Sequence, residues 1–314
     1  MIGIIIPAYN VAQYLGATLD SILLQTASDW QCIIVDDGST DKTAAVAEGY
    51  VAGDARFLFL QQKNAGPCVA RNLAFGKLDT SIKYVSFMDA DDIYESDALE
   101  RLRTEVESHP NAVGSHGLAD MIDAEGRPLN AGTFADMGRR RLGYDGNAIV
   151  AWPLDKPTTF EVLLYASKVY PPGLIMARRE IYEKVGPWDP RIPIAADWDM
   201  ILRLSRHGEL RFLNRVILKY RRHPANISNQ LRKNYAEIRY LYHKTFFSPE
   251  NSDAQRRSLK GGWRAWQLYK IREKLGQSRE HIRAGRALRG TQLLAHLPAH
   301  VYRYARGYPT ASRL

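Results

Sequence analysis

Short apolar runs alternate with longer amphipathic stretches along the first hundred residues. The runs are rich in β-branched and aromatic residues and predict buried strands, at residues 2–6, 32–35, 57–60 and 84–88. In the stretches between them apolar residues recur at helical spacing, which predicts helices at residues 12–25, 43–51 and 67–75. A β-α-β-α order of this kind produces a mostly parallel sheet, and its ligands bind beyond the carboxyl ends of the strands.

The middle of the chain is less regular. A strand at residues 113–122 is predicted to pair with residues near Thr133 across a turn at Glu125-Gly126-Arg127, and residues 134–157 are predicted to form a long loop. Regular structure is expected to resume after Pro171-Pro172-Gly173. The expected strands cover residues 174–177 and 210–220, and the expected helices cover residues 178–185 and 197–207.

From residue 231 onward the pattern predicts helices only. Breaks are expected near Pro249, Gly261-Gly262, Gly276 and Pro298. Apolar side chains in residues 255–290 form two stripes, and such a helix needs cover on both sides, from the body, a second subunit or lipid. The last predicted helix carries Arg303 and Arg306 beside apolar residues. It suits either an interfacial helix on anionic lipid or an appendage packed on the core.

Composition places the chain among globular proteins, because 45% of its 314 residues are hydrophobic and 25% are charged. The net charge of +9 is unevenly placed: residues 231–314 hold 18 Lys/Arg and 5 Asp/Glu, so the rest of the chain is slightly acidic. An anionic partner is therefore expected for the C-terminal quarter, either a membrane surface, a nucleic acid or an acidic protein.

The sequence also predicts a compartment. No apolar run approaches 18 residues, and the first residues lack the basic region and cleavage site of a signal peptide. Cys32 and Cys68 are too few for a disulfide framework and fit a reducing environment. We therefore expect a cytoplasmic protein, either free or peripheral on the inner face of the cell membrane.

Candidate chemistry lies at the ends of the predicted strands. The first strand ends in Pro7-Ala8-Tyr9-Asn10, and the second ends in Asp36-Asp37 followed by Gly38-Ser39. A carboxylate here can accept the imide N–H of a uracil ring, and an aromatic face such as Tyr9 can stack on that ring. The alternative is an Asx-type turn, in which Asp37 or Ser39 bonds its own backbone.

The fourth strand ends in the acidic run Asp89-Ala90-Asp91-Asp92. Three carboxylates so close together repel one another unless a cation or hydrogen-bond donors compensate. Hard oxygen ligands at this density suit Mg²⁺ or Mn²⁺ held jointly with substrate phosphates. The alternative is a solvated acidic turn that caps the next helix, near Ser96.

A third segment, Asn64 to Asn72, lies between these motifs. Gly66 permits a tight turn, and Pro67 suits the first position of a helix. Arg71, one turn into that helix, can contact base or phosphate, or it can pair with Asp36 or Asp89. Cys68 is best interpreted as a small buried side chain.

These four motifs resemble, in order and spacing, those of the family 2 glycosyltransferases, which use nucleotide-diphosphate sugars. The resemblance covers about 225 residues and continues through Gly186-Pro187-Trp188-Asp189, Ala195-Ala196-Asp197-Trp198-Asp199 and Tyr220-Arg221-Arg222-His223. It implies an α/β GT-A fold, Rossmann-like, with a mostly parallel central sheet and a C-terminal helical region. The expected boundaries are a GT-A domain at 1–228, with a nucleotide-sugar half at 1–108 and an acceptor half at 109–228, and a basic helical extension at 229–314.

The resemblance also implies roles for single residues. Tyr9 and Asp37 correspond to residues that grip the base, Asp89 to one near the ribose, Asp91 to the metal ligand and His223 to a histidine near the diphosphate or metal. The donor-binding residues expected in full are Pro7, Ala8, Tyr9, Asn10, Asp36, Asp37, Asn64, Gly66, Arg71, Asp89 and Ala90. A divalent cation, Mn²⁺ or Mg²⁺, and a nucleotide-diphosphate sugar are therefore expected ligands.

Asp197 corresponds to the catalytic base; its structural alternative is the N-cap of the following helix. Ala196 stands where the family often has Glu, so the supporting carboxylate is either missing or supplied by Asp199. Trp188, Trp198 and Asp199 are the expected acceptor residues, although both tryptophans equally suit the core.

The implied function is inverting, metal-assisted transfer of a sugar, with a UDP-sugar as donor and a hydroxyl of a glycan or glycolipid as acceptor, in cell-surface or secreted polysaccharide synthesis. An inactive sugar-binding or scaffold relative is the alternative. A second copy of the chain, in a homo-oligomer, is a further candidate partner. A nucleic-acid-binding protein would leave the four motifs without use, so no nucleic acid is expected. A dinucleotide-dependent dehydrogenase is disfavoured because Gly-x-Gly-x-x-Gly does not follow the first strand.

Overall fold

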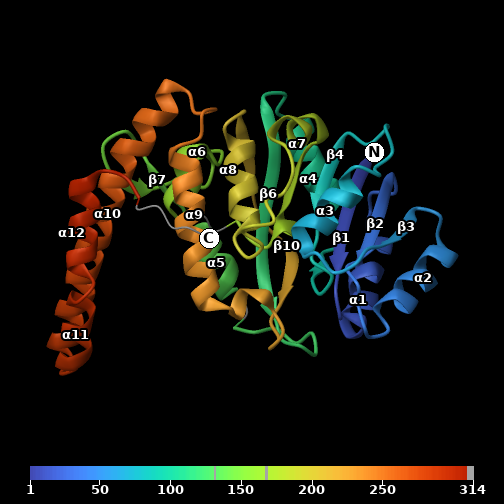
Figure 1. The fold of residues 1–314 in the computed structure, drawn as a ribbon, viewed down its shortest axis with the longest axis horizontal. Coiled ribbons are helices and arrows are strands. Elements are labelled where there is room, and N and C mark those ends of the chain that lie inside the picture. The colour runs from blue at the N-terminus through green and yellow to red at the C-terminus, as the bar shows by residue number, and fades with distance from the viewer. Residues whose placement is uncertain (131, 167–168, 310–314) are drawn as a thin grey trace.

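A central sheet organises the protein in the computed structural model, which describes residues 1–130, 132–166 and 169–309. Within these residues eight strands form the sheet in the order β3-β2-β1-β4-β9-β6-β10-β5 (Figure 1). They are β1 (Ile2–Ala8), β2 (Trp30–Asp36), β3 (Phe57–Gln61), β4 (Tyr84–Phe87), β5 (Ile93–Tyr94), β6 (Ala112–Ile122), β9 (Ile175–Arg178) and β10 (Glu209–Arg221).

The sheet is mostly parallel, as the sequence predicts. Strands β3, β2, β1 and β4 are mutually parallel, and β6 is parallel to β10. Strand β9 joins the two groups and is antiparallel to both β4 and β6, and the short β5 pairs antiparallel with β10 at the edge. The carboxyl ends of β1, β2 and β4 therefore meet at one edge of the sheet, where the predicted motifs lie.

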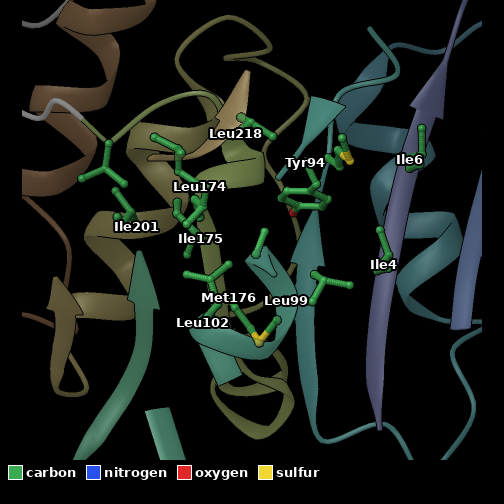
Figure 2. Packing of buried hydrophobic residues seen from close by; sticks show 14 of the residues in the cluster. Ile4, Ile6, Tyr94, Leu99, Leu102, Leu174, Ile175, Met176, Ile201 and Leu218 are labelled. Atoms are coloured by element: carbon green, nitrogen blue, oxygen red, sulfur yellow. The ribbon is translucent and has the colours of Figure 1, made fainter. Parts of the chain in front are cut away.

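Helices cover both faces of the sheet because successive side chains of β1 and β2 point to opposite sides. Ile4 and Ile6 of β1 belong to one buried cluster with α1 (Ala12–Leu23) and α4 (Ala98–Glu107), which Figure 2 shows around Tyr94 and Leu99. Ile5 belongs to the opposite cluster with α3 (Pro67–Phe75), α7 (Arg179–Val185) and α8 (Ala196–Ser205). Each fully buried Ile of this kind stabilises the fold by about 1.5–3 kcal/mol. The helix α2 (Thr43–Gly53) packs beside α1.

The middle of the chain is more ordered than its pattern predicts. The expected loop at 134–157 contains a hairpin of β7 (Leu142–Tyr144) and β8 (Ile149–Ala151), and Thr133 begins helix α5 (Thr133–Arg139) instead of pairing as a strand. Arg141 organises this region, because its buried guanidinium donates to the carbonyls of Pro153 and Lys156. A short helix, α6 (Phe160–Ala166), precedes a 3₁₀ turn at Pro172–Leu174.

The C-terminal region is helical, as predicted, but its breaks differ. It contains α9 (Leu231–Phe246), α10 (Asp253–Arg283), α11 (Ala287–Leu294) and α12 (Leu297–Arg306). The predicted breaks at Gly261-Gly262 and Gly276 are wrong, since α10 runs through both. Gly261 is needed for packing, because a Cβ there would collide with the hydroxyl of Tyr144.

The first half of the C-terminal region packs on the body, while the second half extends from it. Leu241 of α9 and Leu259 and Trp263 of α10 are buried in the main cluster. Helices α11 and α12 pack against α10, and the three form an arm at the end of the molecule opposite to β1–β3 (Figure 1). Across the described residues, the helices are either too short or too polar to cross a bilayer.

Candidate active site

Two loops at the ends of β1 and β2 are tied together. The strands pair in register with Ala8 beside Asp36, and the amide of Asp37 donates to the carbonyl of Ala8 at 2.8 Å. Asn10, with a φ of 51°, donates its amide to Ser39 Oγ at 2.9 Å and accepts from the amide of Thr40 at 2.8 Å. These bonds leave the ring of Tyr9 49% exposed, so it is free to stack on a flat ligand.

Asp37 holds the next loop in place. Its carboxylate is buried and accepts from Gln62 Nε2 at 2.7 Å and from the amides of Ala65 and Gly66, each at 2.8 Å. Gly66 has a φ of 90°, which favours glycine, and α3 begins at the next residue. Asn64 Nδ2 donates to the carbonyl of Asp37 at 3.0 Å. The expected donor residues Asp37, Asn64 and Gly66 therefore form one connected turn.

An Asx-type turn forms at Asp36, not at Asp37 or Ser39, where it was the alternative to a ligand contact. Asp36 Oδ1 accepts from the amide of Ser39 at 3.1 Å, and its side chain is buried. Ala8 and Ala90 are buried as well, and Pro7 is partly buried. Direct contact of Asp36 or Asp37 with a base stays a prediction.

Arg71 pairs with Asp89, one of the two partners considered from the sequence. Arg71 Nη2 lies 2.7 Å from Asp89 Oδ1, and the guanidinium carbon lies 4.7 Å from the ring centroid of Trp188. Burial raises the pKa of Asp89, Arg71 lowers it and Asp91 raises it further. Trp188 is buried and packs edge-on against Phe87, so its position is in the core, behind this ion pair.

Asp91 lies opposite His223, the residue predicted to share the metal. Asp91 Oδ2 is 2.8 Å from His223 Nε2 and 3.3 Å from Asn226 Nδ2. The imidazole is fixed by the ring of Tyr14, with centroids 4.6 Å apart. Asn226 is not among the residues predicted from the sequence, although its place three residues after His223, in the same turn, is a usable signal.

Asp92 has a structural role. Its buried Oδ1 accepts from the amide of Arg221 at 2.9 Å, and its Oδ2 has no hydrogen-bond partner among the described residues. Burial raises the pKa of Asp92 well above the ordinary value, with Asp91 and Asp89 adding to the rise. Arg221, also missed, donates its Nε to the carbonyl of Asp91 at 2.8 Å. The end of β10 is thereby attached to the acidic loop.

Among the described residues, no group of three or more His, Cys, Asp or Glu side chains is arranged as a complete metal site. Asp91 and His223 nevertheless suit a shared site, because one carboxylate oxygen and one imidazole nitrogen lie side by side. Mg²⁺ and Mn²⁺ commonly use one or two protein ligands and take the others from water and substrate phosphates. The residues present fit that arrangement.

Asp197 is the second residue of α8 and lies close enough to Asp89 and Arg71 for their charges to act on it. Its Oδ1 accepts from the amide of Trp198 at 2.7 Å, whereas the N-cap position belongs to Ala195. Burial raises the pKa of Asp197 to about 7; Asp89 adds to the rise, while the Trp198 amide and Arg71 oppose it. A carboxylate with this pKa is half-ionised near neutral pH, as a general base requires.

The remaining acceptor candidates have structural partners. Trp198 donates its Nε1 to the carbonyl of Leu163 at 2.7 Å. Asp199 is buried against Arg203 at 2.9 Å and Lys244 at 2.8 Å, so its carboxylate is neutralised within the body. The interpretation that Asp199 replaces a missing carboxylate beside Asp197 is therefore not supported by its contacts.

The amino-acid sequence of this chain is similar to those of known proteins. The model of the family described as "Glycosyl transferase family 2" matches residues 3–186. An uncharacterized glycosyltransferase EpsJ of Bacillus subtilis is 29% identical over 73% of this chain, and the chondroitin synthase of Escherichia coli is 29% identical over 73% of it. The matched segments span 63% and 30% of those proteins, less than two thirds of either.

Solved structures agree on the fold. The S. aureus TarS fragment 1–349 in complex with UDP-GlcNAc has a TM-score of 0.63 at 16% identity, with 98% of this chain and 89% of that chain covered. The same fragment in complex with UDP has a TM-score of 0.61, also at 16% identity, with 98% and 87% covered. With the sheet order, the helical C-terminal region and the family match in agreement, this chain belongs to glycosyl transferase family 2.

Proposed function

We propose that this protein is an inverting glycosyltransferase that moves a sugar from a UDP-sugar to a hydroxyl of a glycan or glycolipid. The observation that carries the proposal is Asp197, a carboxylate in the first turn of α8 that is electrostatically coupled to Asp89 and Arg71 and has a pKa near 7. The complexes of the structural neighbour TarS with UDP and UDP-GlcNAc support a uridine donor. The similarity to a chondroitin synthase supports an acceptor in polysaccharide synthesis.

The donor lies across the ends of β1, β2 and β4. Tyr9 stacks on the base, and the turn held by Asp37 surrounds it with backbone groups. Asp89 accepts from the ribose hydroxyls, and Arg71 holds its carboxylate in place by direct pairing. The diphosphate then reaches the loop that carries Asp91.

Asp91 and His223 would hold the divalent cation, with Asn226 orienting the carboxylate. When bound, a cation here offsets the negative charge that develops on the leaving diphosphate. Asp197 accepts the proton of the attacking hydroxyl. That hydroxyl forms a bond to the anomeric carbon as the sugar–phosphate bond breaks, and a single displacement inverts the anomeric centre.

The test is a donor screen on the full chain, in which hydrolysis and transfer are measured with UDP-, GDP- and dTDP-sugars, with and without Mn²⁺. Turnover with UDP-sugars that is lost in Asp197→Asn supports the proposal. Binding of a UDP-sugar without turnover on any acceptor tested would favour the inactive sugar-binding alternative.

We also propose that the arm formed by α10, α11 and α12 binds an anionic membrane surface, while the rest of the chain forms the catalytic body. Large apolar side chains are exposed on it, including Leu288 at 75% and Tyr302 at 58%. Exposed arginines accompany them, at positions 279, 283, 286 and 289. Apolar and cationic side chains together are typical of interfacial helices, and lipid-linked acceptors would be reached there.

A further inference from the structure

The first turn of α8, which carries Asp197, has no cap of its own. Ala195 is at the N-cap and Ala196 is at the first helical position, and neither side chain can accept a hydrogen bond. Helix starts leave backbone N–H groups unsatisfied unless a side chain, water or ligand accepts from them. Asp197 itself accepts from the amide of Trp198, so the backbone before Asp197 depends on contacts from elsewhere in the chain.

Glu237 of α9 supplies such a contact. Its Oε2 accepts from the amide of Ile194 at 2.7 Å and from the amide of Ala195 at 3.1 Å. Glu237 is fully buried, and these two amides immediately precede the helix that begins at Ala196. A carboxylate that accepts from backbone N–H groups makes strong, short hydrogen bonds, and its charge suits the positive end of a helix.

The same face of α9 is attached to α8 at a second point. Lys244 lies seven residues, or two helical turns, after Glu237, so both side chains project from one face. Lys244 Nζ pairs with Asp199 at 2.8 Å and with Asp189 at 3.0 Å. Between these points, the ring of Tyr242 packs edge-on against Trp198.

The two attachments act on different parts of α8. Glu237 binds the backbone amides of Ile194 and Ala195, just before Asp197. Lys244 binds the side chain of Asp199, which follows Asp197 in the helix. Loss of Glu237 frees the segment that leads into Asp197, while loss of Lys244 weakens the docking of α9 in general. This difference supplies a matched pair of variants.

From these contacts we infer that Glu237 is a positioning residue for the proposed reaction: it fixes the backbone at 194–195 so that Asp197 faces the anomeric centre. The inference rests on the proposed role of Asp197. It also makes α9 part of the catalytic unit, although α9 falls within the extension expected from the sequence at 229–314. A misplacement of ~1 Å in a reacting group costs up to about 10²-fold in rate.

The experiment compares kcat for transfer, KM for the UDP-sugar and thermal stability in full-length variants. Glu237→Met removes the acceptor at similar volume and should lower kcat about 10- to 100-fold while KM for the donor stays within about twofold. Glu237→Gln keeps an acceptor oxygen of the same reach and should restore most of kcat. Lys244→Met should lower the melting temperature without lowering kcat.

Wild-type kcat in Glu237→Met, or equal losses of kcat in Glu237→Met and Lys244→Met, would overturn the positioning role. If Glu237→Met does not fold, Glu237→Asp takes its place, because it keeps the charge but cannot reach both amides; wild-type kcat in that variant overturns the inference equally. Asp197→Asn separates the two proposals. Loss of kcat there but not at Glu237 refutes only the inference, whereas retention of kcat in Asp197→Asn refutes the base assignment and the inference with it.

Discussion

His223 Nε2 lies 2.8 Å from Asp91 Oδ2, although 132 residues separate them along the chain. The contact joins the loop after β4 to the turn after β10. Arg221 reinforces the join by donating to the carbonyl of Asp91. The proposed metal site is thus assembled only when the two halves of the sheet are in place.

Asp91→Asn should abolish transfer and remove the effect of Mn²⁺ on UDP binding. The amide is a weak metal ligand and cannot offset the charge of a cation, whereas Asp91 is the carboxylate nearest to His223. Calorimetric titration with UDP, with and without Mn²⁺, measures the change. Asp92→Asn is the control, because a raised pKa favours a neutral acid at this buried position. Undiminished Mn²⁺-dependent UDP binding in Asp91→Asn would refute the metal assignment.

The pH profile of the enzyme should report Asp197. A general base must be ionised, so kcat/KM for the acceptor should rise with a slope of one up to a pKa of about 7 and then level off. Asp197→Asn should lower kcat by about 10²–10⁴ and remove that acid limb. Donor affinity, measured by UDP titration, should stay near the wild-type value. A loss of donor affinity as large as the loss of kcat would indicate instead that Asp197 supports the fold around the donor site.

The raised pKa of Asp197 also predicts how the stability of the folded protein depends on pH. The folded state raises the pKa of Asp197 from 3.8 to about 7, so folding favours the protonated form and the ionised form costs stability. Asp197→Asn removes this cost while the amide oxygen still accepts from Trp198. Its melting temperature should therefore exceed that of the wild type at pH 8, and the gain should shrink as the pH falls from 7 towards 4. A variant that is less stable at pH 8 would contradict the burial of Asp197.

The sequence predicted the parts of this molecule that depend on local pattern. Buried strands such as β1 and β2 are apolar on both faces, so their residues identify them without tertiary information. The common location of the motifs at the strand ends was predictable as well, because parallel strands bring their carboxyl ends to one edge of the sheet. The pairing of Arg71 with Asp89 was also among the alternatives that spacing and charge allowed.

Other features depend on contacts that no local pattern contains. The helix α10 continues through Gly261-Gly262 because close packing against Tyr144 outweighs the low helix propensity of glycine. Asp199 lies two residues from Asp197, yet at this spacing helical side chains point to different sides, and it pairs with Lys244. Glu237 lies 42 residues from Ala195, and nothing in its own neighbourhood indicates the backbone to which it binds.

The last prediction concerns the arm and tests membrane binding without removing any helix. Deletion of residues 231–314 would expose the core around Leu241 and Trp263, so substitutions are the cleaner experiment. Four arginines, at positions 279, 283, 286 and 289, are exposed and can be changed to Gln together. Each basic residue near an anionic surface contributes about 1 kcal/mol, and screening shortens its reach from about 10 Å at 0.1 M salt to about 3 Å at 1 M.

The wild type should therefore sediment with phosphatidylcholine vesicles that contain phosphatidylglycerol, and should be released by high salt, whereas the fourfold variant should stay in solution and still bind UDP. The matched control changes four exposed lysines of the body to Gln, at positions 42, 77, 83 and 184, and should sediment like the wild type. An equal loss of sedimentation in both variants would show that vesicle binding depends on the net charge of the protein and not on the arm. If the wild type does not bind anionic vesicles at low salt, the arm has a different partner. A change in the oligomeric mass of the fourfold variant would identify that partner as a second copy of the chain.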